Sequence, residues 1–170
     1  MGYFEKRRNQ GKLNEDFYKP LKESDIKEEL ECSKNYFSAF DFENDHFLIE
    51  LKTREVERLK YSTTIIGYDK ILKGLEHLKE NKRVIFYFGF KTDGLFKFEL
   101  TQDNYTDFKV STIGCRFRQI QNYEKQHLEI PVNQLTFVCP ECPIQGEYSK
   151  VVKQVYQAQQ LHLRIQNQHH

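Results

Sequence analysis

The stretch Phe37–Arg54, FSAFDFENDHFLIELKTR, decides the fold of this chain because it has the pattern of a β-hairpin. Asn44-Asp45 is a turn signal, and aromatic, aliphatic and β-branched residues flank it, as two short strands joined by a tight connection require. Side chains alternate between the two faces of a strand, so every second residue of the second half shares one face. That face is apolar and is expected to pack on a core through Phe47, Ile49 and Leu51.

The opposite face of the predicted hairpin carries acidic groups and a lysine. If the loop is Asn44-Asp45, Asp41 pairs with Leu48 across the hairpin. Asp41 then lies diagonal to Glu50 on the same face, and Lys52 follows two residues further along. Carboxylates that converge on a strand suit Mg²⁺, which prefers oxygen ligands. A lysine beside them supplies positive charge near an attacking water or a phosphate, which is the chemistry of phosphodiester hydrolysis.

A longer loop changes which acid faces Glu50. If residues 43–45 form the loop, Asp41 pairs with Phe47 and points away from Glu50. Asp45 is then the alternative acidic ligand. The sequence leaves this choice open, and an ordinary solvated strand face is the alternative to both arrangements.

These residues resemble a known signature. Asp41, followed by Glu50-Leu51-Lys52, is similar to the D…(D/E)-x-K motif of the PD-(D/E)XK nuclease superfamily, which includes restriction endonucleases and Holliday-junction resolvases. Phe40 stands where the motif has proline. The resemblance implies an α/β fold with a restriction-endonuclease-like mixed sheet, an αβββαβ core and, in this chain, an antiparallel β extension. It also implies a Mg²⁺- or Mn²⁺-dependent endonuclease.

The resemblance assigns roles to the residues of the motif. Asp41, Glu50 and the backbone carbonyl of Leu51 are the implied metal ligands. Lys52 is the implied catalytic lysine, which orients the nucleophile. A bound metal would lower the pKa of its water and neutralise charge that grows on the phosphate.

Two helices are predicted to flank the hairpin. The pattern of residues 25–36 is typical of an amphipathic helix, and the resemblance implies that one of its glutamates points at the metal; we choose Glu29. A second helix over residues 65–79 carries a basic stripe that includes Lys70 and Lys73. Lys70 is the catalytic basic residue that the resemblance takes from this helix, where it would contact phosphate, and Tyr68 is the second choice. Solvent-exposed charges are the alternative for both helices.

The rest of the chain divides into three predicted parts. Residues 1–20 have no apolar period and are expected to form a basic arm or loop, residues 21–138 the nuclease-like core, and residues 139–170 a C-terminal turn and helix. Arg83–Phe90, RVIFYFGF, is a near-continuous apolar run that predicts a central strand beside the Glu-x-Lys strand. Leu95–Leu100 is expected to continue the sheet as an antiparallel neighbour.

The formal net charge of +1 means that any surface for nucleic acid must come from local clusters of basic residues. The expected partner is nucleic acid, DNA in preference to RNA. The candidate contacts are Arg7, Arg8, Arg54 and Lys73.

Cys139 and Cys142 have the spacing of half a zinc site. No second pair of cysteines exists to complete such a site, so we expect two reduced thiols and not zinc.

The apolar runs are far shorter than a membrane span and the N-terminus is polar, so we expect an intracellular protein that is neither secreted nor bound to a membrane. A viral, mobile-element or repair setting suits a compact nuclease, and a homodimer is left open. The rival interpretation is a nuclease-fold subunit that binds nucleic acid or assembles without catalysis. The presence of both acids and the lysine favours the enzyme.

Overall fold

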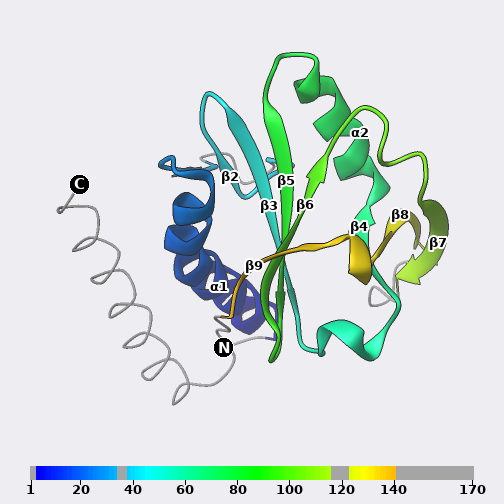
Figure 1. The fold of residues 1–170 in the computed structure, drawn as a ribbon. Helices are drawn as coiled ribbons and strands as arrows, with labels where there is room; N and C mark the ends of the chain where they lie inside the picture. Colours follow the sequence, from blue (N-terminus) through cyan, green and yellow to red (C-terminus); the bar gives the residue numbers. More distant parts are fainter. Residues whose placement is uncertain (1–2, 34–37, 116–122, 141–170) are drawn as a thin grey trace.

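The computed structural model describes residues 3–33, 38–115 and 123–140 and has a mixed α/β fold. A six-stranded mixed sheet has the order β1-β2-β3-β5-β6-β9, and a three-stranded antiparallel sheet has the order β4-β8-β7. Helix α1 covers one face of the larger sheet, and α2 lies with the smaller sheet on the other face (Figure 1). The elements are α1 (Tyr3–Ile26), β1 (Glu31–Cys32), β2 (Phe42–Glu43), β3 (Phe47–Arg54), a 3₁₀ turn (Arg58–Lys60), β4 (Thr63–Gly67), α2 (Tyr68–Leu78), β5 (Arg83–Phe90), β6 (Gly94–Leu100), β7 (Lys109–Cys115), β8 (Tyr123–Pro131), a second 3₁₀ turn (Val132–Gln134) and β9 (Thr136–Cys139).

The centre of the larger sheet is the strand β5, which confirms the prediction from its apolar sequence. It runs parallel to β3, from Phe47 opposite Arg83 to Arg54 opposite Phe90, and antiparallel to β6. Its side chains are buried on both faces because Val84 belongs to the core under α2 whereas Ile85 belongs to the core under α1. A strand covered on both sides reads as a continuous apolar run.

The first helix differs from the prediction. Residues 1–20 were expected to be an arm or loop and residues 25–36 a helix, but a single helix runs over Tyr3–Ile26 and includes Pro20. It ends where Lys27 takes a positive φ of 60°. The side chains that α1 buries against the sheet include polar ones, so no apolar period marks the helix in the sequence. These buried side chains are Asn14, Tyr18, Leu21 and Lys22.

The second helix also begins later than expected. Residues 65–67 belong to β4, and α2 starts at Tyr68. The run Thr63–Ile66 is β-branched throughout, which favours a strand, and this strand finds a partner in β8.

The predicted antiparallel extension is present in a different form. β6 and β9 extend the larger sheet, but β7 and β8 join β4 in a sheet of their own. Residues of α1 pack on the core of the larger sheet, and β9 continues to Cys139, one residue past the predicted end of the core at 138. The C-terminal helix expected within residues 139–170 lies outside the described residues, which end at 140. Neither of the two described helices combines the length and hydrophobicity that a membrane crossing needs.

Candidate active site

The hairpin register decides which acid faces Glu50, and both predicted registers are wrong. Phe42 pairs with Ile49 and Glu43 with Leu48. The backbone N–H of Asp41 donates to the carbonyl of Ile49 at 3.0 Å, so the next residue of β3, Glu50, lies directly across from Asp41 and on the same face. Asp41 therefore stands opposite Glu50 and not diagonal to it.

The side chain of Asn44 explains the shift in register. Its Oδ1 accepts hydrogen bonds from the backbone N–H groups of His46 at 2.9 Å and Phe47 at 2.7 Å. The turn therefore closes between Asn44 and Phe47, whose carbonyl accepts the Asn44 N–H at 3.0 Å. Asp45, the alternative acid, lies in this turn and is exposed. The turn thus separates Asp45 from the acids of the site.

Glu50 is fully buried and is the chemical centre of the site. Its Oε1 accepts from the ammonium groups of both Lys52 and Lys70. Its Oε2 has no hydrogen-bond partner among the described residues. Burial raises the pKa of Glu50 and the charge of Asp41 adds to this, while Lys52 and Lys70 oppose it.

Asp41 is held by the backbone of the strand that carries Glu50. Its Oδ2 accepts the N–H of Leu51 at 2.7 Å. This contact is available because β2 is only two residues long, so the edge of β3 beyond Ile49 has no neighbouring strand there. The sequence thus brings two carboxylates together at the point where the hairpin opens.

A hollow of about 250 Å³ lies between this open edge and α1. Its lining comes from α1, from Asp41 and from β3, and consists of Gly11, Asn14, Glu15, Asp41, Leu51, Lys52 and Thr53. Asn14 Nδ2 donates to Thr53 Oγ1 at 3.2 Å and ties the helix to the strand. A Cβ atom at Gly11 would meet nothing within 4 Å, so the helix leaves space at the mouth of the hollow.

Glu15 is the residue of this site that sequence reasoning missed. It lines the hollow together with Asp41. Burial raises the pKa of Glu15, and the charges of Asp41 and Glu50 raise it further, while the charge of Lys22 opposes this. Glu15 lies on the same helix face as Tyr18 and Lys22, which follow it by three and seven residues and are both fully buried. This spacing was the signal in the sequence that Glu15 points toward the sheet.

Glu29 does not reach the site. It is exposed and lies beyond the end of α1, and its backbone carbonyl accepts from Asn44 Nδ2 at 2.9 Å. The glutamate of α1 that lines the hollow is Glu15. The assignment failed because the helix was expected in the segment that follows its actual end.

Lys70 and Lys73 separate on α2. Lys70 turns toward the sheet, where it donates to the carbonyl of Ala39 at 2.6 Å in addition to contacting Glu50. Lys73 is exposed to solvent. The structure therefore brings Lys70 to the acids and leaves Lys73 on the surface.

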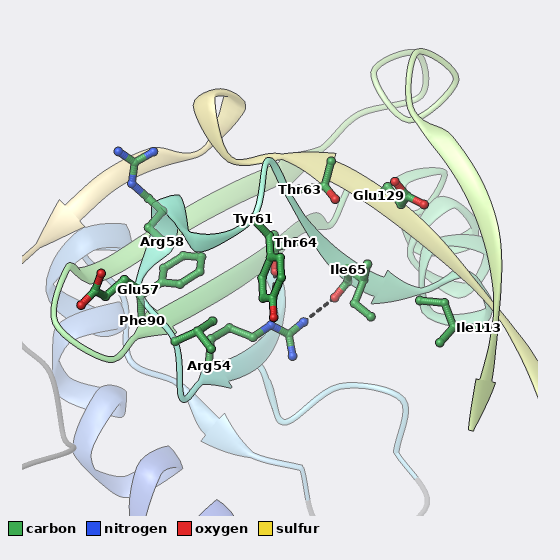
Figure 2. Close-up of a pocket in the computed structure, with 11 residues that line it drawn as sticks. Arg54, Glu57, Arg58, Tyr61, Thr63, Thr64, Ile65, Phe90, Ile113 and Glu129 are labelled. Atoms are coloured by element: carbon green, nitrogen blue, oxygen red, sulfur yellow. Dashed lines mark hydrogen bonds between the residues drawn. The ribbon is translucent and has the colours of Figure 1, made fainter. Parts of the chain in front are cut away.

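Of the other predicted contacts, Arg54 does not line this hollow. Arg54 Nε donates to Thr64 Oγ1 at 3.2 Å and its Nη2 to the carbonyl of Ile65 at 2.5 Å, so it links β3 to β4 (Figure 2). Arg7 and Arg8 belong to α1, and their side chains lie outside the described part.

The cysteines were expected to take no part in the metal site, and only some of them fall within the described residues. Cys139 is the last residue of β9, and Cys142 lies outside the described residues. Within residues 3–33, 38–115 and 123–140, no three His, Cys, Asp or Glu side chains form a ready metal cage. A metal at this site would therefore rest on Asp41 and Glu50 with oxygens from backbone, water or substrate, which is the ligand set that Mg²⁺ commonly uses.

Comparison with known proteins finds no matching family model, no similar curated protein and no similar solved structure. The functional conclusion therefore depends on the geometry of the site.

Proposed function

We propose that this protein is a divalent-metal-dependent endonuclease, which hydrolyses phosphodiester bonds of nucleic acid and prefers DNA. The observation that carries the proposal is the position of Asp41 directly opposite the buried Glu50, whose carboxylate contacts Lys52 and Lys70. Two carboxylates and two ammonium groups at one strand edge suit a metal ion and a phosphate together.

The order of the elements supports a restriction-endonuclease-like fold for the larger sheet. A helix, three strands, a helix and a strand follow one another as α1, β1, β2, β3, α2 and β5, with β4 inserted before α2. This order agrees with the αβββαβ core that the superfamily resemblance implies, and so it supports the proposed fold. The sheet of β4, β8 and β7 is then an addition to that core.

The carboxylates of this site are oxygen ligands, which hard cations such as Mg²⁺ and Mn²⁺ prefer. The negative charge of Asp41 raises the pKa of both Glu15 and Glu50, and a bound cation would relieve the same repulsion. Asp41 and Glu50 would hold Mg²⁺ or Mn²⁺, with the backbone carbonyl of Leu51 as the third ligand that the resemblance implies. A bound metal supplies a water of lowered pKa and neutralises charge that grows on the phosphate.

The two lysines take different roles in this proposal. Lys52 lines the hollow, and about a third of its side chain is exposed (33%), so it can hold the attacking water and stabilise the charged transition state. Lys70 is enclosed between Glu50 and the carbonyl of Ala39. Lys70 is therefore a positioning residue that orients Glu50, in place of the phosphate contact that the resemblance implies for it.

The test of catalysis is a cleavage assay on plasmid, linear and branched DNA with Mg²⁺, Mn²⁺ or EDTA. Lys52→Ala is expected to slow single-turnover cleavage by about 10²–10³-fold with nearly unchanged affinity in Ca²⁺, because the charge is needed mainly in the transition state. Lys91→Ala removes an exposed lysine beyond the end of β5 and is the matched control, expected to leave the rate unchanged.

The helix glutamate has its own matched pair of variants. Glu15→Gln is expected to weaken Mg²⁺ binding and cleavage by about 10–100-fold, the range typical of residues that support metal ligands. Glu29→Gln changes an exposed glutamate just beyond the same helix and is expected to change neither. Equal effects of the two variants would contradict the assignment of Glu15.

A binding subunit without catalysis is the second candidate. It is favoured by one observation, namely that Lys52 and Lys70 already compensate the charge of Glu50 without a metal. Nucleic-acid binding by the unmodified protein, with no cleavage of any substrate and no Mg²⁺ binding by calorimetry, would establish this alternative in place of the nuclease.

A further inference from the structure

A second hollow, of about 430 Å³, lies between the end of β3 and the smaller sheet (Figure 2). Its walls come from the segment after β3, from β4, and from the neighbouring strands β7 and β8 of the smaller sheet. Ile65 and Ile113 supply apolar surface, and the hydroxyls of Thr63 and Thr64 and the carboxylate of Glu129 supply polar groups. A pocket of this size with a few polar groups suits a small organic ligand.

Arg54 lines this hollow, and its guanidinium group uses only part of its hydrogen-bonding capacity. Two of its nitrogens bond to Thr64 and Ile65, whereas Nη1 has no hydrogen-bond partner and the guanidinium has no carboxylate partner among the described residues. Burial lowers the pKa of Arg54, although a guanidinium stays charged at neutral pH. A partly buried cation without a counter-ion is costly, so an acceptor on a ligand would stabilise it.

Tyr61 gives the same hollow an open aromatic surface. The residue is 60% exposed although it lines the hollow, and the ammonium of Lys60 lies 5.8 Å from its ring centroid. An exposed aromatic ring beside basic side chains is the usual platform on which proteins stack the bases of single-stranded nucleic acid.

The distance from Arg54 to the acid cluster suits two nucleotides of one nucleic-acid strand, one at each site. Arg54 follows Glu50 by four residues on one continuous strand, which places the two about 13 Å apart at roughly 3.3 Å per residue. That is about four base steps at 3.4 Å each. A base inside a duplex is stacked between its neighbours and cannot enter such a hollow, so the base must be unpaired or flipped out.

We propose that the hollow lined by Arg54 and Tyr61 binds an unpaired nucleobase, which stacks on the Tyr61 ring and accepts a hydrogen bond from Arg54. This inference rests on the proposed function, and it narrows the substrate to nucleic acid with unpaired nucleotides a few steps from the bond that is cleaved.

The test uses a single-stranded oligonucleotide that carries 2-aminopurine, whose fluorescence falls when the base stacks on an aromatic ring. Binding to the full chain is measured in Ca²⁺, and Tyr61→Leu is expected to reduce both the quenching and the affinity, the latter by about 5- to 150-fold. Tyr61→Phe keeps the ring and is expected to restore both. Phe137→Leu removes another exposed aromatic, outside the hollow, and is the matched control that should change neither.

The outcomes separate this inference from the proposed nuclease. Unchanged binding by Tyr61→Leu, or an equal loss on a fully paired duplex of the same sequence, would overturn the base site even if the protein cleaves DNA. Quenching that depends on Tyr61, in a protein that cleaves no substrate, would support the base site and overturn the nuclease.

Discussion

A buried lysine beneath the acid cluster should make the stability of this protein depend on pH. Lys22 of α1 is fully buried, its ammonium lies 3.4 Å from the ring centroid of Phe42, and it has no hydrogen-bond partner among the described residues. Burial lowers the pKa of Lys22 from 10.5 to about 7, although the charges of Asp41 and Glu15 oppose this. The amine therefore loses its proton in the folded protein far more easily than in the unfolded chain.

The sign of the effect follows from proton binding. Between pH 7 and 10.5 the unfolded chain holds a proton on Lys22 that the folded protein has released, so the free energy of unfolding rises with pH across this window. Each tenfold change in proton affinity corresponds to about 1.4 kcal/mol. The fall in the pKa of Lys22 from 10.5 to about 7 therefore corresponds to a rise of about 5 kcal/mol in the free energy of unfolding. This rise begins near pH 7 and is complete above pH 10.5.

Lys22→Met isolates this contribution because methionine fills a similar volume without a charge. Urea unfolding of both proteins between pH 6 and 10 should show Lys22→Met as the more stable at pH 7, with an advantage that shrinks by several kcal/mol toward pH 10. Taking the difference between the two proteins removes the titration of all other groups. Lys19→Met changes a less buried lysine of the same helix, paired with Glu23, and should shift stability by about 0.5 kcal/mol or less at every pH.

The reasoning would be refuted if the stability difference between the unmodified protein and Lys22→Met were the same at pH 7 and pH 10. It would also be refuted if Lys22→Met were the less stable at pH 7, because a paired and favourable charge would then occupy this position.

Three further predictions concern other parts of the molecule. Lys73→Ala, on the exposed side of α2, should weaken nucleic-acid binding and flatten its logarithmic salt dependence by about one unit of slope if this lysine contacts phosphate; an unchanged slope in a salt titration would exclude the contact. Gly89→Ala should destabilise the protein by about 1–3 kcal/mol in urea unfolding, because the added Cβ would lie 2.8 Å from Cε2 of the buried Tyr18; an unaffected midpoint would show that the ring can move. Tyr87→Phe should cost about 1–2 kcal/mol, since the hydroxyl donates to Asp25 at 2.6 Å in a largely buried contact, and thermal unfolding that matches the unmodified protein would contradict this.

Sequence alone identified the parts of the fold that depend on local periodicity. The apolar run of β5 predicted a strand buried on both faces, and the structure confirms it beside β3. Likewise, the alternation along β3 placed Glu50 and Lys52 on one face, and they are in contact in the structure. These predictions succeeded because the period of two and the apolarity of a strand are written directly in consecutive residues.

The position of the first helix could not be predicted in the same way. Its buried face includes Asn14 and Lys22, which the hydrophobic pattern counts as solvent-facing. Asn14 bonds to Thr53 on β3, and Lys22 packs over Phe42 on β2. Only the presence of the sheet makes these polar positions internal.

The arrangement of the acids was decided by the tertiary structure for a related reason. One side chain, Asn44, closes the turn and sets the register that puts Asp41 opposite Glu50, whereas the sequence was compatible with two other registers. Glu15 belongs to α1 and precedes Asp41 by 26 residues in the chain, yet it lies near the same acids. Residue types and strand alternation determined which groups are available for chemistry, and the docking of α1 on the sheet determined which of them meet, because long-range contacts leave no periodic signal in the chain.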